Sequence, residues 1–328
     1  MATIKDVAKI SGVSIATVSR VLNNRGYLSD EIKQKVNDAM KELDYQPNDL
    51  ARSLHNQKSF IMGLIVPAVS HPFFGELTRR FELYAHRQGY KLLVCNSLND
   101  KVKEREYIDM LKRSQVDGIM MGSHLLDIDD YIGLSFPICS LDRQLGDSIP
   151  YICSDNHNGG VLATRHLIEQ GCKKILHICG SLEIDMLSNR RTDAFVSICE
   201  EADIPYVICE LPDSSVTDFG EEELLRDVLE KNADCDGVFA TSDITAAMVM
   251  SIALSTGRRI PEDLKVIGFD GGMISTLTYP RLSSIQQPID AICRYAVEYL
   301  IRKMNGEDVP NQTILPVTLI QRESTVRK

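Results

Sequence analysis

Residues 14–36, SIATVSRVLNNRGYLSDEIKQKV, decide how the first part of this chain folds. They hold two stretches with the apolar periodicity of a helix, and each follows a serine that can cap it, Ser14 and Ser29. Asp30 and Glu31 open the second stretch, where a helix dipole favours carboxylates. Two consecutive short helices are therefore predicted.

A third helix precedes these two. Thr3 and Asp6 have the spacing of a capping box, and Gly12 ends the helix after about two turns. The join at residues 11–14 is short, which is typical of a helix-turn-helix, whose second helix places its N-terminal residues against base edges in the major groove. The alternative is a plain three-helix bundle with a solvated polar face. On the second helix the candidates for DNA contact are Ser14, Ile15, Ala16 and Thr17, followed by Ser19, Arg20 and Asn23.

The charge distribution supports contact between this first part and nucleic acid. The whole chain of 328 residues has a formal net charge of −10. Residues 1–58 contain nine Lys and Arg against seven Asp and Glu, a net charge of +2, so the remaining 270 residues carry −12. The acidic part would repel nucleic acid, and the first 58 residues would not.

The segment YQPNDLARSLHNQKS at residues 45–59 predicts one more short helix, which Asn48 can cap. Such a helix is marginal alone in water, so it should order only when something packs on it. Its apolar residues include Ala51 and Leu54, and Leu54 lies close to Arg52. This arrangement fits a wedge that opens a minor-groove base step. The alternative is a flexible linker.

After residue 59, short apolar runs alternate with amphipathic helical stretches, which predicts parallel sheets. The alternation alone also allows one long doubly wound sheet. The predicted strands are Ile61–Val66, Lys91–Cys95, Gly118–Met121, Ile138–Leu141, Ile175–Cys179, Val207–Cys209, Gly237–Ala240 and Val266–Phe269, with helices such as Phe73–Gln88 and Asp155–Gln170 between them.

Polar motifs follow these strands, where the ligands of parallel sheets bind. Carboxylates and guanidinium groups hold vicinal sugar hydroxyls by paired hydrogen bonds, and phenylalanines can supply an aromatic wall. The candidate ligand-binding residues are Phe73, Phe74, Ser123, His124, Asp142, Arg143, Asp155, Arg191, Asp243 and Asp270.

Simpler structural roles remain open for several of these residues. Asp243 and Asp270 could be helix caps at strand ends, and Arg143 could be a surface partner of the preceding aspartate. His124 could be a solvated loop residue, and His71 has the same interpretation.

The stretches TIKDVAKISGVSIATVSRVLN (residues 3–23) and YQPNDLARSL (residues 45–54), followed by the long α/β body, resemble the lactose-repressor (LacI/GalR) family of bacterial transcription regulators. The resemblance covers essentially the whole chain, and DVAxxxGVSxxTVSRVLN is highly specific in that context. It implies an α-helical helix-turn-helix headpiece and an α/β, two-lobed core like type I periplasmic binding proteins, with parallel sheets. It also implies a homodimer on near-palindromic double-stranded operator DNA.

The resemblance implies the following domain organisation. A DNA-binding headpiece comes first, then a hinge helix with its linker, then an effector-binding and dimerisation core whose chain crosses between two lobes. The expected ranges are 1–46, 47–58 and 59–328, with lobe one at about 60–156 plus 288–318 and lobe two at about 157–286 plus 319–328.

It also implies residue roles. Ile15 and Ala16 fall where members differ and choose the operator sequence, and Leu54 matches the leucine lever at the operator centre. Effector positions match at Phe73, Phe74, Ser123, Asp142, Asp155, Arg191 and Asp270. The complete set of predicted DNA contacts is Thr3, Ser14, Ile15, Ala16, Thr17, Ser19, Arg20, Asn23, Tyr27, Ser29, Tyr45, Asn48, Ala51, Arg52 and Leu54.

Within the family, NNRGYLS, GSHLLDIDDY, SDNHNGG and TYPRLSSIQQPI look like the sucrose-operon repressors of Gram-positive bacteria. This resemblance implies a repressor of a carbohydrate-utilisation operon, released from DNA by sucrose, a fructose-containing saccharide or its phosphate. The alternatives are another sugar, a purine or a phosphocarrier protein as partner, with the effector acting as co-repressor.

Several classes lack support in the sequence. The segment after the first predicted strand, VPAVSHPFF, is not the GxGxxG of a nicotinamide enzyme, and no GxSxG elbow occurs. CxxC and HxxxH spacings are missing, so no metal or cofactor is expected. No signal peptide is recognisable, and the apolar run FIMGLIVP is too short to span a bilayer, so we expect a cytoplasmic protein without a membrane partner and not a periplasmic one.

Overall fold

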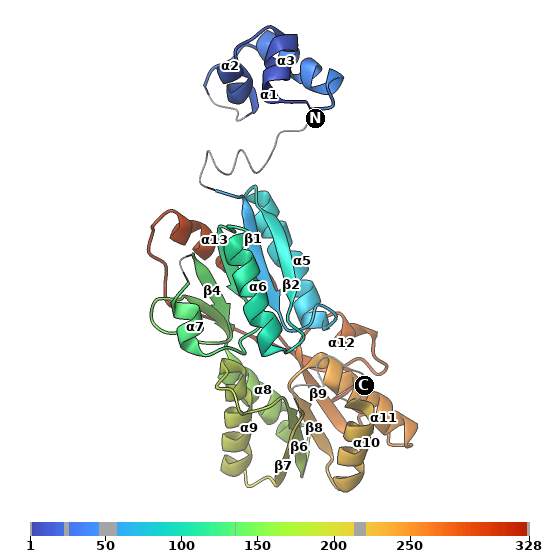
Figure 1. Ribbon diagram of the computed structural model, residues 1–328. Coiled ribbons are helices and arrows are strands. Elements are labelled where there is room, and N and C mark those ends of the chain that lie inside the picture. The colour runs from blue at the N-terminus through green and yellow to red at the C-terminus, as the bar shows by residue number, and fades with distance from the viewer. Residues whose placement is uncertain (1, 23–25, 46–57, 135, 213–220, 327–328) are drawn as a thin grey trace. The chain divides into compact units, whose positions relative to one another are not determined.

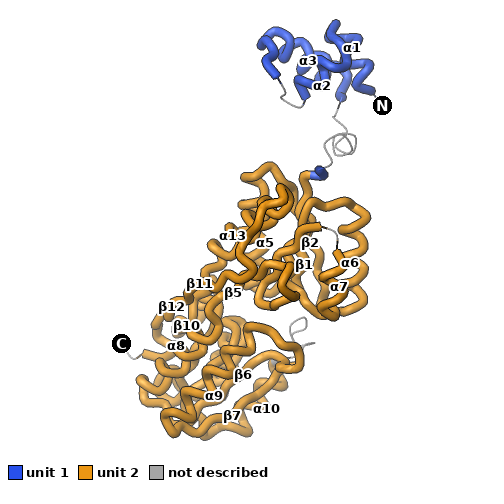
Figure 2. The backbone as a smooth tube through the Cα atoms, turned by 90° about the vertical axis from the view of Figure 1, so that its left-hand side faces the viewer, with its two compact units in different colours: residues 1–59 blue, residues 60–328 orange. Residues whose placement is uncertain are grey.

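The computed structural model describes residues 2–22, 26–45, 58–134, 136–212 and 221–326. The chain divides into two compact units, residues 1–59 and 60–328, which Figure 2 shows in different colours. The predicted hinge helix at residues 47–58 lies outside the described residues, apart from its last position.

The first unit contains the three predicted helices, α1 (Ile4–Ser11), α2 (Ile15–Leu22) and α3 (Asp30–Glu42) (Figure 1). The Asp6 carboxylate accepts hydrogen bonds from the Thr3 N–H at 2.8 Å and the Thr3 hydroxyl at 2.7 Å, so the predicted cap of α1 is confirmed. The helices share a small apolar core, because one face of each is apolar at helical spacing. Its buried residues are Val7, Ala8, Val18, Val36 and Ala39.

The second unit has two six-stranded sheets within its described residues, each with helices on both faces (Figure 1). The prediction of a two-lobed α/β core with parallel sheets is confirmed, and the alternative of one long sheet is wrong. The first sheet is entirely parallel, in the order β11-β5-β4-β3-β1-β2. Its strands are β1 (Ile61–Val66), β2 (Lys91–Asn96), β3 (Gly118–Met121), β4 (Ile138–Leu141), β5 (Tyr151–Ser154) and β11 (Gln312–Leu315).

The second sheet has the order β12-β10-β9-β8-β6-β7. It is parallel except at its edge, where β12 runs antiparallel to β10. We call the first sheet with its helices lobe one and the second lobe two. The strands of lobe two are β6 (Ile175–Cys179), β7 (Tyr206–Glu210), β8 (Gly237–Ala240), β9 (Lys265–Asp270), β10 (Ser283–Gln286) and β12 (Thr318–Ile320).

Helices cover both faces of each sheet, which explains the continuous apolar runs of the central strands. In lobe one, α5 (Pro72–Arg87) and α13 (Ile289–Met304) pack on one face, with α6 (Lys101–Arg113) and α7 (Ile128–Ile132) on the other. In lobe two, one face is covered by α8 (Asn156–Glu169) and α9 (Arg190–Glu201), and the other by α10 (Glu221–Lys231) and α11 (Asp243–Ser255). The short helices η1 (Leu187–Asn189) and α12 (Ile274–Leu277) complete lobe two.

The chain passes between the lobes at three places, from β5 to α8, from β10 to α13 and from β11 to β12. The strand Tyr151–Ser154 is missing from the sequence-based prediction, because its four residues carry neither alternation nor a long apolar run. No described helix is both long enough and apolar enough to span a membrane.

Helices α8 and α9 cross closely at Gly160. A Cβ atom there would lie 2.5 Å from the Arg191 carbonyl oxygen and 2.9 Å from the Ala194 Cβ. We expect Gly160→Ala to lower the free energy of unfolding by about 1–3 kcal/mol, because the two backbones must move apart. Urea unfolding followed by circular dichroism measures this change.

The matched control is Gly133→Ala, whose added Cβ would meet its nearest neighbour, the Asp129 carbonyl, at 3.6 Å. This control should stay within about 0.5 kcal/mol of the unsubstituted protein. Equal stability of the two alanine variants would contradict the close crossing.

Candidate functional site

The N-terminal turn of α2 presents small polar and apolar side chains to solvent. The Ser14 hydroxyl accepts a hydrogen bond from the Thr17 N–H at 3.1 Å, and the Ser14 and Thr17 hydroxyl oxygens are 2.9 Å apart. Ile15 is 44% exposed, although isoleucine is normally buried, and Ala16 is exposed too. This turn therefore offers side chains that contribute little to the core of the unit.

The other predicted DNA contacts lie elsewhere in residues 1–59. Arg20 lies further along α2 and is exposed, and the Tyr27 side chain is fully exposed. Thr3 and Ser29 are exposed at the starts of α1 and α3. Ser19 is half-buried, and Tyr45 is half-buried and packs against the apolar core. The residues Asn23, Asn48, Ala51, Arg52 and Leu54 lie outside the described residues.

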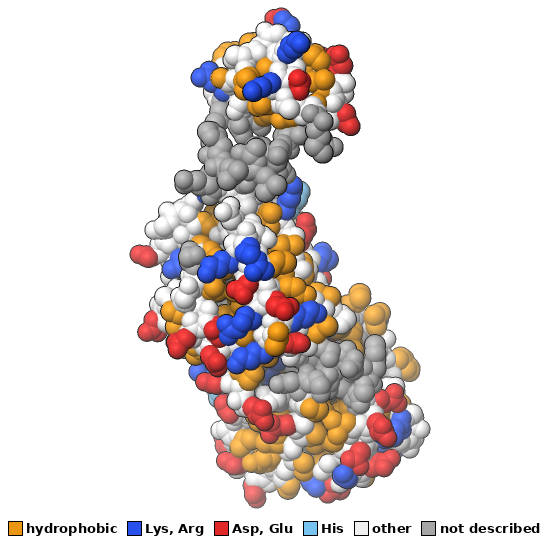
Figure 3. Space-filling view, in the orientation of Figure 1, with side chains coloured by type: hydrophobic (Ala, Val, Ile, Leu, Met, Phe, Trp, Pro, Cys, Tyr) orange, Lys and Arg blue, Asp and Glu red, His pale blue; other side chains and the backbone are white. Residues whose placement is uncertain are grey.

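The second unit shows a different kind of surface. Lys and Arg side chains are interspersed with Asp and Glu side chains over the α6 and α7 face of lobe one (Figure 3). Arg105 of α6, for example, pairs with Asp130 of α7 at 2.6 Å. Such mixed charge is not the uniformly basic surface that binds nucleic acid.

A cavity of about 300 Å³ lies between the two lobes. Residues that follow the carboxyl ends of strands in both sheets line it, because parallel strands of one sheet end at the same edge. Lobe one supplies residues after β1, β2, β3 and β4. Lobe two supplies residues after β6 and β8 and the last residue of β9, Asp270. Five of the predicted ligand-binding residues line it, namely Phe73, Phe74, Asp142, Arg191 and Asp270.

Aromatic rings form one wall of this cavity. The rings of Phe73 and Phe74 meet edge to face with centroids 5.2 Å apart, and the His71 ring lies 5.7 Å from that of Phe74. His71 is not an ordinary loop residue, because it caps α5 and its Nδ1 accepts a hydrogen bond from the Phe73 N–H at 3.3 Å. Burial lowers the pKa of His71 to about 4, so its ring is neutral at pH 7.

The Arg191 guanidinium lies buried on the lobe-two side. It stacks 3.6 Å from the centroid of the Phe269 ring, a cation–π arrangement. Its Nε donates to the Asn156 Oδ1 at 2.8 Å, and its Nη1 donates to the Thr241 carbonyl at 3.0 Å. These contacts hold the guanidinium plane in one orientation against the cavity.

Carboxylates surround this cation. Burial raises the pKa of Asp142, and the Arg191 charge opposes that shift. Burial also raises the pKa of Asp270, and the neighbouring Asp243 raises it further. The Asp270 carboxylate accepts from the Gln287 Nε2 at 2.7 Å. Burial raises the pKa of Asp243 as well, so both of these adjacent carboxyl groups hold their protons more tightly than a free aspartic acid does.

The cleft residues adjoin a second and larger cavity of about 920 Å³, reaching the N-terminal ends of α5 and α13 and the start of α12. His71, Phe73, Asp270 and Gln287 line both cavities. The two spaces therefore meet at the lobe crossings.

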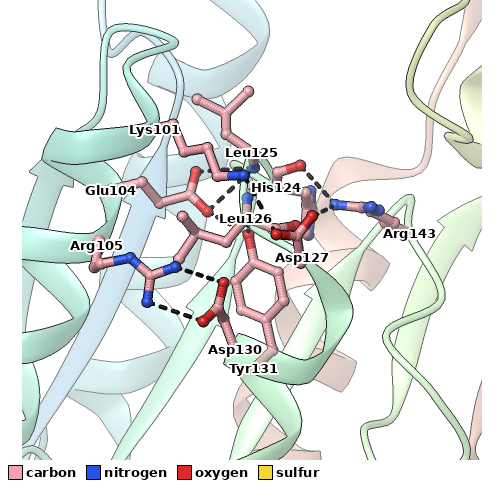
Figure 4. A network of polar contacts seen from close by, with 10 residues as sticks. All are labelled: Lys101, Glu104, Arg105, His124, Leu125, Leu126, Asp127, Asp130, Tyr131 and Arg143. Atoms are coloured by element: carbon pink, nitrogen blue, oxygen red, sulfur yellow. Dashed lines mark hydrogen bonds and ion pairs between the residues drawn. The ribbon is translucent and has the colours of Figure 1, made fainter.

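Ser123, His124 and Arg143 do not line the cleft cavity, because they hold the loop after β3. Figure 4 shows His124 and Arg143 in this network. The buried Ser123 hydroxyl donates to the Glu104 carboxylate at 2.5 Å. The buried His124 Nε2 is 2.9 Å from the Ser140 Oγ, and Arg143 Nη1 donates to the His124 carbonyl at 2.6 Å. Burial lowers the pKa of His124 to about 3, so this ring is neutral and is not a solvated loop residue.

Glu104 is the centre of that network, and the sequence-based prediction omits it. Its carboxylate also accepts from the Tyr131 hydroxyl and from the Leu125 N–H at 3.2 Å. A buried carboxylate needs several donors, and the loop after β3 supplies them. The signal in the sequence was weak, because a glutamate on an amphipathic helix is usually solvated.

The remaining two predicted residues, Asp155 and Asp243, lie outside the cleft cavity as well. Asp155 caps α8 by accepting from the Asn158 N–H at 3.0 Å. Asp243 accepts from the Gly272 N–H at 2.8 Å and lines the larger cavity. Conversely, the sequence-based list lacks His71, Asn156, Thr241 and Gln287. Asn156 and Gln287 stand at predicted lobe crossings, and a polar side chain at a crossing was the signal available.

The sequence matches two known protein families. Residues 3–48 match the family described as bacterial regulatory proteins, lacI family, and residues 164–325 match the periplasmic binding protein-like domain. The sucrose operon repressor of Streptococcus mutans is 41% identical over 99% of both chains. The ribose operon repressor of Halalkalibacterium halodurans is 38% identical over 99% of this chain and 97% of that protein.

Two solved structures are similar. A periplasmic binding protein/LacI transcriptional regulator from Alkaliphilus metalliredigens, complexed with D-xylulofuranose, is 35% identical with a TM-score of 0.73, over 81% of this chain and 99% of that one. The lac repressor dimer bound to operator and an anti-inducer shares the fold, with a TM-score of 0.85, 24% identity and 99% of each chain covered. The family predicted from the sequence is thereby confirmed. The chain belongs to the lacI family of bacterial regulatory proteins, DNA-binding transcriptional regulators that are not enzymes.

Proposed function

We propose that this protein represses a carbohydrate-utilisation operon and leaves its operator when a neutral saccharide binds between the lobes. The observation that carries the proposal is the cleft itself, where an aromatic wall faces a buried guanidinium and two carboxylates from both lobes. Sucrose or another fructose-containing sugar is the first candidate, and the similarity to the sucrose operon repressors of Streptococcus mutans and Lactococcus lactis supports it.

The cleft has the groups that saccharide recognition needs. Phe73 and Phe74 supply an apolar face, and the charged side chains can make paired hydrogen bonds to vicinal hydroxyls. A space of about 300 Å³ is at the small end of ligand pockets. A sugar therefore fits this space, which adjoins the larger cavity of about 920 Å³.

The charge of the cleft favours a neutral sugar over its phosphate. Among the described residues that line it, Asp142 and Asp270 are carboxylates, Arg191 is the single cation and His71 is neutral. A dianionic phosphate would have no surplus positive charge to meet. The ligand of the similar Alkaliphilus regulator, D-xylulofuranose, is a neutral sugar as well.

The DNA end of the proposal rests on the first unit. Ser14, Ile15, Ala16 and Thr17 would meet base edges, with Arg20 on phosphate or a guanine edge. The predicted contacts at Thr3, Ser19, Asn23, Tyr27, Ser29, Tyr45 and the hinge belong to the same proposal, in which Leu54 enters the minor groove. The protein would act in the cytoplasm, with its operator.

A homodimer completes the proposal, since it would place two headpieces on a near-palindromic operator. Lobe two exposes three large apolar side chains around α12, a group that a second copy could cover. Met273 is 74% exposed, Leu277 71% and Tyr279 93%. We propose two lobe orientations whose balance the effector shifts by binding one more tightly. The other effectors considered, a purine or a phosphocarrier protein, find no specific support in the cleft.

The function is tested by operator binding. Fluorescence anisotropy with labelled promoter DNA should show tight binding that sucrose or fructose weakens at least tenfold, because the effector favours the orientation that releases DNA. Glucitol at equal concentration controls for viscosity and osmolarity. The proposal would be refuted if the protein did not bind operator DNA, or if no saccharide changed its affinity for operator DNA.

Charge selectivity has its own test. Calorimetric titration should show that a neutral sugar binds at least tenfold more tightly than its phosphate, because only Arg191 offers positive charge. Asp142→Asn should narrow that ratio several-fold by removing one carboxylate, and asparagine tolerates the positive φ of 55° at this position. Asp147→Asn, at an exposed site, is the control. Preference for the phosphate by the unsubstituted protein would reverse the assignment.

Operator affinity should fall steeply with salt, because binding releases counterions from phosphate. Arg20→Ala should lower the slope of log affinity against log salt by about one if the guanidinium meets phosphate. Lys103→Ala, on the α6 face of lobe one, should leave the slope unchanged. A salt slope near zero for the unsubstituted protein would contradict the predicted headpiece contacts.

A further inference from the structure

Asp142 of lobe one accepts hydrogen bonds from two residues of lobe two. It follows β4 of lobe one, and two donors from lobe two reach it. The Leu187 N–H, at the start of η1, donates to the Asp142 carbonyl at 2.9 Å. The Asn156 Nδ2, in the first turn of α8, donates to the Asp142 carboxylate at 3.0 Å. Backbone and side chain are thus both held from across the cleft.

Asn156 uses both ends of its amide in this contact. It is 3% exposed, and its Oδ1 accepts from the Arg191 Nε at 2.8 Å while its Nδ2 donates to Asp142. An amide between a guanidinium donor and a carboxylate acceptor has only one favourable orientation, because a flip would place N–H against N–H. The neutral amide of Asn156 therefore orients both the Asp142 carboxylate of lobe one and the Arg191 guanidinium of lobe two.

The backbone of Asp142 is also unusual. Its φ is 55°, in the left-handed region, which is unfavourable for most residues other than glycine. Its N–H donates to the Ile152 carbonyl at 3.1 Å, while its carbonyl meets Leu187. Hydrogen bonds to both the N–H and the carbonyl of Asp142 therefore hold this conformation, and one of them comes from the other lobe.

The atoms that we expect to bind the saccharide, Asp142 Oδ2 and Arg191 Nη2, take no part in these hydrogen bonds. Among the described residues, no hydrogen-bond partner is found for the Asp142 Oδ2 or the Arg191 Nη2, and both side chains line the cleft cavity. A saccharide can therefore bind these atoms without breaking the Asn156 bridge. The bridge holds the two charged groups in place before the ligand arrives.

We propose that Asn156 and the Leu187 N–H form an interlobe latch on Asp142, which holds the lobes together in the absence of ligand and preorganises the saccharide site. Its effect on saccharide affinity rests on the proposed function, whereas the latch does not. A lobe rotation that moved Asp142 away from η1 and from the start of α8 would break both contacts. The latch therefore shifts the balance of lobe orientations by the free energy of those contacts. Asn156 is a positioning residue in this scheme.

Hydrogen exchange in the ligand-free, full-length protein tests the latch directly. Asn156→Ala should raise the exchange rate of the Leu187 amide about three- to tenfold, because its acceptor is no longer held. The amide of Ile178, in β6 of the lobe-two core, should keep its rate, which separates a local opening from general destabilisation. Asn158→Ala, an exposed asparagine in the same turn, is the matched control and should change neither rate. An unchanged Leu187 rate in Asn156→Ala would overturn the latch.

A second variant removes the other donor. Leu187→Pro deletes the N–H at the first position of η1, and Met186 before it has the extended backbone, ψ 144°, that precedes proline comfortably. Each single variant should weaken saccharide binding about three- to tenfold in calorimetry. The double variant should lose less than the product of the two effects, since both donors act on one contact. Fully multiplicative losses, or tighter binding, would overturn the joint action of the two donors.

The two proposals fail separately. If the Leu187 amide exchanges faster in Asn156→Ala while neither protein binds any saccharide, the latch stands and the proposed effector is wrong. If saccharide affinity falls while the Leu187 rate stays constant, Asn156 serves only to orient Arg191 and the latch is wrong.

Discussion

The buried guanidinium of Arg191 is the interaction on which the rest of the site depends. A charge out of water costs several kcal/mol unless partners surround it, and here they come from both lobes and from three directions. The Arg191 guanidinium stacks on the Phe269 ring and donates hydrogen bonds to Asn156 and Thr241. The carboxylates of Asp142 and Asp270 interact with its charge. Carboxylates alone in this cleft would lose their charge, and the cation alone would be unpaired.

The close packing of α8 on α9 has the same origin. Because Gly160 has no Cβ, the first turn of α9, which contains Arg191, can approach α8 closely. The glycine in α8 thus helps to set the position of the Arg191 side chain in α9. The amide of Asn156, at the start of α8, then passes that position on to Asp142 in lobe one. Packing, hydrogen bonding and electrostatics thus act along a single route across the cleft.

The fold separates two incompatible surfaces. Contact with DNA needs a surface that does not repel phosphate, whereas a sugar site needs acceptors for hydroxyl groups, which are largely carboxylates. The chain has its net +2 in residues 1–58 and its net −12 in the remainder. Two compact units, 1–59 and 60–328, keep these surfaces on different bodies.

Local chemistry in the sequence by itself determined the starts of α1 and α3, most of the strand positions and the family. The capping pair of Thr3 and Asp6 and the apolar run of β1 each act over a few residues. Their structures can therefore be predicted from the local sequence. Only the tertiary structure decided which polar residues share the cleft. Ser123 and Asp142 both follow strands of one sheet, yet Ser123 turns to the buried Glu104 and Asp142 to the cavity. The hydrogen-bond needs of a buried carboxylate 19 residues away settle that difference, and no local pattern records them.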